Sequence, residues 1–311
     1  MKHRILSALV IIFLVGVIIA QCIGIKNIEA NRSQPQDEPT QQVDATVTPQ
    51  TTQPQDTQPQ TTQPTVQEQT TEQEDETPAT PDQKNSNKPE STKEIIDQYT
   101  LLVDKFKQQK PAYKKKEYQA LPEEYHNFSS VINKFLGLAS GYMVTEDEAE
   151  ELVRASGAEE IIVDMPIHNS EKGCVLTDYD AVEWAKCEDK GDGTYEISFS
   201  LKEEVNPEPT PADTLVPVSA HGAVMQPMAF NDIKAEVDKV LAKIPGVVLN
   251  QLDLFYREHV YSCVYNPETD EVLSITHHIV IDIVVNADVF SKNIDGSARL
   301  LNEMFIYDIT W

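Results

Sequence analysis

Histidine is the residue type that most readily supports acid–base or metal chemistry near neutral pH, and four of the seven histidines fall in one region of this sequence. His259, His277 and His278 lie in two segments whose apolar and polar residues alternate, a pattern that predicts a β-hairpin. His221 lies in a proline-rich stretch before them. These imidazoles are the candidates for a zinc site or a general base.

A predicted turn at residues 267–270 sets the register of this hairpin. In that register His259 faces His278 on the outer side of the sheet, and His277 points inward. Two opposed histidines supply at most two zinc ligands, and Cys263 is about 13 Å from His259 along the strand. We therefore expect no metal ion and no cofactor, and we interpret these histidines as ordinary sheet residues.

Motifs for catalysis are absent from the sequence. Residues 137–141, GLASG, do not match G-x-S-x-G, and residues 219–221, SAH, have no carboxylate at a diagnostic spacing. Residues 189–193, DKGDG, lack the ligand pattern of an EF-hand loop and predict a hairpin turn. We expect no catalytic residue, so the sequence favours a protein that is not an enzyme.

Two of the four cysteines have a spacing that suits a disulfide. Cys174 and Cys187 are thirteen residues apart and flank the segment TDYDAVEW. A bridge that closes such a loop stabilises a domain by about 3 kcal/mol in the chain-entropy model. We therefore consider a Cys174–Cys187 disulfide, with reduced packing thiols as the alternative, and we expect Cys263 to be a buried thiol.

The chain begins with a segment that predicts a membrane anchor. Residues 5–25, ILSALVIIFLVGVIIAQCIGI, are almost continuously apolar. As a helix they would extend about 30 Å, which matches the hydrocarbon core of a bilayer. The basic residues before them predict that residues 1–4 are cytoplasmic. The sequence thus predicts a single-pass protein of the cell membrane, with its C-terminal domain outside the cytoplasm.

Two other fates of this segment remain open. A secretory peptidase could cut after Ala30, because residues 28–30 loosely follow the small-x-small rule. Lipidation of Cys22 is the second alternative, although Gln21 departs from the small residue that lipoprotein signals need before the cysteine.

Residues 26–90 predict a disordered linker. The tract is rich in Gln, Thr, Pro and acidic residues, and it has too few apolar side chains to bury a core. Within it, Pro49, Pro54, Pro59 and Pro64 recur every five residues. Such spacing stiffens the chain without supplying hydrogen bonds, so we interpret the tract as a spacer.

The chain carries a net charge of −26, and most of it falls on the residues after the linker. A protein this acidic repels nucleic acid, so we expect no nucleic-acid partner. The run Lys114, Lys115 and Lys116 is the local exception, and we interpret it as a solvated basic turn.

Residues 91–157 predict a small helical subdomain. Ser91 and Glu94 have the spacing of a capping box and open the first helix, which ends before Pro111. A second apolar stripe predicts a helix from Pro122 to about residue 141. The acidic run at 145–157 begins with another capping-box pattern and predicts a third helix.

Residues 158–311 predict an α+β domain. An amphipathic helix is expected at 231–244, and a very long strand follows at 273–289, with its apolar residues on one face. Strands at about 252–265 and 297–310 complete an antiparallel meander. A strand of this length twists strongly, so we expect a long curved β-meander that wraps the helix.

An apolar ligand could lie between this curved sheet and the helix. Six side chains would line it: Ile233, Val237, Leu241, Ile279, Ile281 and Ile283.

Two segments, GCVLTDYDAVEWAKCEDKGDGTYEISFSL and YSCVYNPETDEVLSITHHIVIDIVV, carry a resemblance to known proteins. With the N-terminal anchor and the linker, they resemble uncharacterised extracytoplasmic proteins of Gram-positive bacteria. The resemblance covers roughly residues 160–311. It implies a compartment and a cell type, and no catalytic residues.

These features favour an extracytoplasmic binding domain, anchored in the membrane through its N-terminal helix. Its ligand could be a lipid or another apolar small molecule, or it could bind a partner in the cell envelope. One alternative is a structural or interaction subunit of a cell-envelope assembly. The other is a hydrolase of envelope polymers, which would need titratable groups clustered in a cleft.

Overall fold

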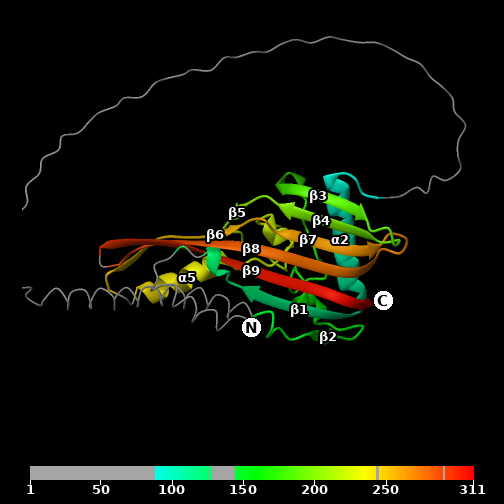
Figure 1. The fold of residues 1–311 in the computed structure, drawn as a ribbon, viewed down its shortest axis with the longest axis horizontal. Coiled ribbons are helices and arrows are strands. Elements are labelled where there is room, and N and C mark those ends of the chain that lie inside the picture. Colours follow the sequence, from blue (N-terminus) through cyan, green and yellow to red (C-terminus); the bar gives the residue numbers. More distant parts are fainter. Residues whose placement is uncertain (1–87, 126, 128–143, 243–244, 290) are drawn as a thin grey trace, which may run out of the picture. The chain divides into compact units, whose positions relative to one another are not determined.

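The computed structural model describes residues 88–125, 127, 144–242, 245–289 and 291–311, which belong to one compact unit (Figure 1). These residues form an α+β fold with a nine-stranded antiparallel sheet and few helices, which confirms the predicted class. The predicted membrane span and nearly all of the predicted linker lie outside the described residues. Within the part of the chain that is described, no helix is long and apolar enough to cross a membrane.

The helices and strands follow one another along the chain in a fixed order. They are α2 (Thr92–Gln109), β1 (Ala112–Ala120), β2 (Leu152–Arg154), α4 (Ile161–Asp164), β3 (Val182–Asp189), β4 (Tyr195–Leu201), β5 (Glu204–Val205), α5 (Phe230–Leu241), β6 (Val247–Tyr256), β7 (Val260–Asn266), β8 (Glu271–Val289) and β9 (Lys292–Thr310). Short 3-10 turns occur at Glu123–Tyr125, Tyr179–Ala181 and His221–Ala223.

Strand β8 has 19 residues and is long enough to pair with three strands, β6, β7 and β9. One of its edges pairs with β9. Its opposite edge pairs first with β7 and then with β6, so two successive strands share that edge. The main path of the sheet is β2-β1-β9-β8-β7-β4-β3, and β5 pairs with β6. The β3–β4 hairpin confirms the turn predicted at residues 189–193.

The predicted apolar face of the long strand is confirmed over residues 275–287, where every second side chain is buried. The predicted turn at residues 267–270 is also confirmed. The prediction is wrong at Leu273, which is 39% exposed and does not share the buried face. Consecutive residues of β7 pair with Val272 and Ser274, so Leu273 is the extra residue of a β-bulge and the register shifts there.

Helix α2 packs against β3 and β8 and buries its apolar side in the core (Figure 1). The predicted capping box is confirmed: the Ser91 side chain accepts from the Glu94 N–H, and the Glu94 carboxylate accepts from the Ser91 N–H. The helix ends at Lys110, whose φ of 49° is left-handed. The buried side chains of α2 include Ile95, Ile96, Tyr99, Leu102, Val103 and Phe106.

The rest of the predicted helical subdomain is different in the structure. Residues 145–157 are not a helix, because the contact of Thr145 with Glu148 closes only one turn and residues 152–154 then form strand β2. Arg154 holds this short strand through a bidentate ion pair with Asp164, at 2.6 and 3.3 Å. Most of the second predicted helix lies outside the described residues.

The lysine run predicted as a solvated turn is part of strand β1, which pairs with β9. Lys114 and Lys116 point to the solvated side, whereas Lys115 is 5% exposed. The Lys115 ammonium donates to the Asp164 carbonyl at 2.6 Å and forms an ion pair with Glu117 at 3.0 Å. Lys115 is therefore accommodated in the strand because its buried ammonium has an acceptor and a carboxylate partner.

Helix α5 lies at the other end of the sheet from α2, against β6 (Figure 1). It covers Phe230–Leu241, close to the predicted helix at 231–244. Ile233, Val237 and Leu241 are buried on its inner side. The long sheet is thus covered by two helices in different places, whereas the sequence predicted that one helix would be wrapped.

Lys107 on α2 is fully buried in the core. Its ammonium group donates to four backbone carbonyls, of Met165, Pro166, Ile167 and Lys172, at 3.3, 3.2, 2.8 and 3.0 Å. Burial lowers the pKa of Lys107 to about 7. This side chain therefore fixes the loop at residues 165–172 against α2.

Replacing Lys107 with methionine should leave the carbonyls of Met165, Pro166 and Ile167 without this donor, whereas the Lys172 carbonyl still accepts from the Ile167 N–H. We expect Lys107→Met to lower the free energy of unfolding by about 3 kcal/mol, because buried unsatisfied acceptors are costly. Urea unfolding followed by circular dichroism measures the change. Lys93→Met is the matched control on the same helix, since the Lys93 side chain is 63% exposed. Equal effects of the two substitutions would show that the carbonyl contacts contribute nothing.

Candidate functional site at the break between β6 and β7

The strand predicted at residues 252–265 is wrong, because the structure has two strands there. Between β6 and β7, residues 257–259 form a break. On β8, Tyr256 pairs with Ile281 and Val260 with His278, so three residues of the break lie opposite two. Glu258 has a left-handed φ of 57°, which is uncommon for a residue other than glycine. Such strain often occurs at functional sites.

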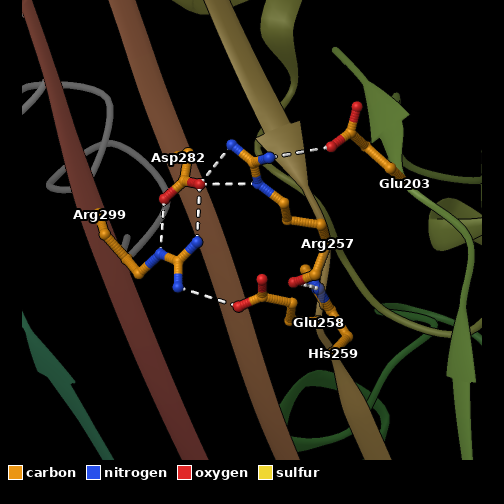
Figure 2. Close-up of polar contacts among 6 residues, drawn as sticks. All are labelled: Glu203, Arg257, Glu258, His259, Asp282 and Arg299. Carbon is orange, nitrogen blue, oxygen red and sulfur yellow. Dashed lines mark hydrogen bonds and ion pairs between the residues drawn. The ribbon is translucent and has the colours of Figure 1, made fainter. Parts of the chain in front are cut away.

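On one face of the sheet, the Asp282 carboxylate binds two arginines (Figure 2). Arg257 donates to Asp282 Oδ2 from Nε at 2.7 Å and from Nη2 at 2.5 Å. Arg299 donates from Nε to Oδ1 at 2.7 Å and from Nη2 to Oδ2 at 2.9 Å. Burial raises the pKa of Asp282, but the two arginines outweigh it and the pKa is lowered.

Two further carboxylates complete this charged network. Glu203 binds Arg257 Nη1 at 3.2 Å, and Glu258 binds Arg299 Nη1 at 2.9 Å (Figure 2). Arg299 also lies over the Tyr125 ring, 4.6 Å from its centroid. Because Asp282 and Arg299 pair directly across β8 and β9, the network joins both strands to the break.

On the core face, the break places His259, which is fully buried. Its Nδ1 lies 2.8 Å from the carbonyl oxygen of Arg257 (Figure 2), so Nδ1 donates and Nε2 is unprotonated in the neutral ring. Burial, with a smaller contribution from His221, lowers the pKa of His259 to about 3. The ring is therefore neutral at physiological pH.

His221 lies next to His259, with the ring centroids 4.7 Å apart. Its Nδ1 is 2.9 Å from Glu204 Oε2, and the same carboxylate accepts from the His221 N–H at 3.0 Å. Burial raises the pKa of Glu204, but the hydrogen bonds from His221 outweigh it and the pKa is lowered. The carboxylate orients this imidazole and leaves its Nε2 facing the core.

The third buried histidine, His277, lies further along β8. Its Nε2 is 2.9 Å from the Tyr99 hydroxyl, and burial lowers its pKa to about 3. Tyr261 lies between it and His259, with ring centroids 5.1 and 6.2 Å away. We call the six side chains that share this region the histidine cluster: His221, His259, His277, Tyr99, Tyr256 and Tyr261.

Three polar atoms of the histidine cluster have no hydrogen-bond partner among the described residues: His221 Nε2, His259 Nε2 and Tyr261 Oη. All three are buried. Most buried polar groups in proteins are paired, so this is an unusual concentration of unsatisfied groups. Chemically, the cluster offers two imidazole nitrogens and one hydroxyl that are buried without partners among the described residues.

The sequence predicted the position of one of these histidines correctly. His277 points inward, as expected. His259 does not face His278 on the outer side, because the break turns it into the core. His278 instead pairs with Val260 and binds Glu303, which raises the pKa of His278. No group of three or more His, Cys, Asp or Glu side chains that could hold a metal occurs within the described ranges.

The Glu204–His221 contact was missed by sequence reasoning. The two residues are seventeen positions apart, on a two-residue strand and in a proline-rich stretch. No periodicity connects them, so the only signal was that both types can pair. The two side chains meet only in the folded chain, in which β5 carries Glu204 and pairs with β6.

The disulfide considered between Cys174 and Cys187 is not formed, and Cys174, Cys187 and Cys263 are buried free thiols. The Val175 N–H donates to Ala223, which holds Cys174 beside the turn at 221–223. Cys187 lies on β3 and pairs with Ile197. Burial raises the pKa of Cys174 to about 11, so this thiol stays protonated.

The six side chains predicted to line an apolar ligand all lie in one apolar core. Their exposed fractions range from 0% to 6%. They are Ile233, Val237 and Leu241 of α5, and Ile279, Ile281 and Ile283 of β8. A ligand-binding role for them stays a prediction.

No protein-family model, no curated protein and no solved structure matches this chain. The resemblance to extracytoplasmic proteins of Gram-positive bacteria therefore stays a prediction.

Replacing Asp282 with asparagine should leave Arg257 and Arg299 without their shared anion. We expect Asp282→Asn to lower the free energy of unfolding by about 2 kcal/mol, since these charges are partly buried. Asp288→Asn, on the same strand, is the control and should change it by less than about 0.5 kcal/mol. Chemical denaturation of both variants measures the two free energies of unfolding. If Asp282→Asn leaves the free energy of unfolding unchanged, the anchoring role of Asp282 is wrong.

Acid should destabilise the domain through its buried histidines. His259 and His277 have folded-state pKa values of about 3, whereas an unfolded histidine has about 6.5. Between these values the unfolded state binds more protons, so the free energy of unfolding falls by about 1.4 kcal/mol per pH unit for each histidine as pH falls. Urea midpoints from pH 7.5 to 4.5 measure the slope.

A substitution tests whether the buried histidines cause this pH dependence of the free energy of unfolding. His277→Gln should reduce it by about half, because one of the two titrating imidazoles is removed. His278→Gln should not reduce it, because the raised pKa of His278 stabilises the fold at low pH and acts in the opposite direction. An unchanged slope in His277→Gln would assign the acid sensitivity to other groups.

Proposed function

We propose that this chain is a membrane-anchored binding domain that lies outside the cytoplasm and has no catalytic activity. The apolar run at residues 5–25 and the basic residues before it support the anchor and its orientation. The proline-punctuated tract that follows supports a spacer between the membrane and the domain.

The observation that carries the binding role over a catalytic one is the burial of the histidine cluster. His221, His259 and His277 have exposed fractions of 0% to 1%. Their hydrogen-bond partners are a carboxylate, a carbonyl and a tyrosine hydroxyl, and a substrate in solution does not reach them. General acid–base catalysis requires the group to come within hydrogen-bond reach of the substrate.

We propose the apolar core that side chains of α5 and β8 share as the place for an apolar ligand, with the ribbon of β6, β8 and β9 curved around the helix. The side chains that both elements place in this core are apolar, and α5 is amphipathic with its charged side toward solvent. A lipid or similar molecule would enter by displacing the helix from the ribbon. Its recognition would depend on apolar area and not on hydrogen bonds.

The alternative is an interaction subunit of a cell-envelope assembly. One observation favours it: the apolar side chains of α5 and β8 already belong to one buried core, with exposed fractions of 6% or less. A partner would then bind the acidic outer surface, and the core would only support it.

Binding of cis-parinaric acid, a fluorescent fatty acid, tests the apolar site. We expect the full chain to bind it, and Val237→Trp, which fills the space beneath α5, to weaken binding about 10-fold. Val248→Trp is the control, because Val248 lies on β6 and is 58% exposed. A correctly folded chain that binds no probe, but co-purifies with envelope proteins in fixed stoichiometry, would replace this proposal with the alternative.

A further inference from the structure

The segment between β5 and α5, residues 206–229, has little regular structure of its own. Its only helical turn is His221–Ala223. We call it the connecting segment. It covers the core side of the break, where His221 contacts His259.

A few polar contacts hold the connecting segment to the sheet. The Glu204 carboxylate accepts from the backbone N–H of Ala220 and His221, at 3.3 and 3.0 Å, and from His221 Nδ1 at 2.9 Å. Near the start of α5, the Met228 N–H donates to the Tyr256 hydroxyl at 3.0 Å. At its start the segment is also held by Asn206, which hydrogen-bonds Leu254 and Asp253 of β6. Over residues 220–221, next to the break, the attachment depends on the Glu204 carboxylate.

The contact between the connecting segment and the break is poorly satisfied. On the segment side, His221 Nε2 is buried without a partner among the described residues, and on the sheet side so are His259 Nε2 and Tyr261 Oη, whose rings lie in the same cluster. Each such group loses its hydrogen bonds to water on closure. Opening would return water to these groups, which offsets part of the apolar contact that is lost.

The groups around His259 leave a proton on its Nε2 without an acceptor. His221 faces it from the connecting segment, Tyr256 from β6 and Tyr261 from β7. His277 and His278 of β8 disfavour a positive charge there. The carboxylate of this region, Glu204 of β5, is already bound by His221. A protonated His259 is therefore accommodated only when water reaches it.

We propose that the connecting segment is an acid-sensitive latch: protonation of His259 favours a locally open form in which residues 206–229 leave the break while the rest of the sheet stays folded. The opening uncovers Tyr256, His259 and Tyr261. The inference stands on the geometry of the break and holds whether the domain binds an apolar ligand or a protein partner.

The direction of the effect follows from proton linkage. His259 has a pKa of about 3 in the closed form, and it approaches the ordinary value of about 6.5 once hydrated. Opening therefore takes up a proton between these values. The equilibrium constant for opening should rise about 10-fold for each pH unit below about 6.5.

Hydrogen exchange of the full chain, read by mass spectrometry at pH 7.5, 6.5 and 5.5, tests the latch. After correction for the intrinsic exchange rate, amides in residues 206–229 should show an opening constant that rises about 10-fold between pH 6.5 and 5.5. Amides of residues 275–281 in β8 open only on global unfolding, so at each pH their opening constant should stay far below that of the connecting segment. Equal opening constants in the two regions, or no rise in the connecting segment, overturn the proposal.

Two variants test whether His259 is the group that takes up the proton on opening. His259→Gln should abolish the rise in residues 206–229, because glutamine does not titrate. His278→Gln, its neighbour on the outer face, should retain it. A His259→Gln chain that folds and still shows the rise contradicts the latch, and if this variant does not fold, the comparison of the two regions in the unsubstituted chain decides alone.

Discussion

The carboxylate of Asp282 is the constraint on which the middle of this fold depends. It lies where one edge of β8 passes from β7 to β6, and it binds an arginine from the break and an arginine from β9. Removing the anion would leave two partly buried cations close together. With the anion present, Arg257 is held on one face of the sheet, and His259, two residues later, enters the core on the other. The charged network and the histidine cluster are thus two sides of the same backbone feature.

The length of β8 explains why two helices are needed. Nineteen residues extend about 60 Å as a strand, whereas the eighteen residues of α2 cover about 27 Å and the twelve of α5 about 18 Å. One helix cannot cover the apolar face of such a strand. Helix α2 packs against β8 and β3, and α5 packs at the other end of the sheet against β6. Within the histidine cluster, α2 covers His277 through Tyr99, whereas the connecting segment covers His259 through His221.

Features that depend on local periodicity were predictable from the sequence. The alternation over residues 275–287, the turn between β3 and β4 and the capping box at Ser91 each follow from residues close in the chain. The bulge at Leu273 and the break at residues 257–259 were not, because both interrupt an alternation that continues through them. Strand β1 was missed for a related reason: Lys115 looks solvated until Asp164, far along the chain, supplies its acceptor. The Glu204–His221 pair likewise depends on a fold already formed.

The pairing of β1 sets an order of events during synthesis. β1 lies near the start of the described chain, yet its long partner is β9, the last strand, and Lys116 pairs with Phe305. A ribosome releases residues 112–120 long before residues 292–310 exist. Until then the edge of β1 has only the three-residue β2 to pair with, and exposed strand edges associate with other chains. The three lysines of β1 place like charges along that edge during this interval. The sheet is completed only when residues 292–310 have emerged, so the pairing of β1 with β9 comes late in folding.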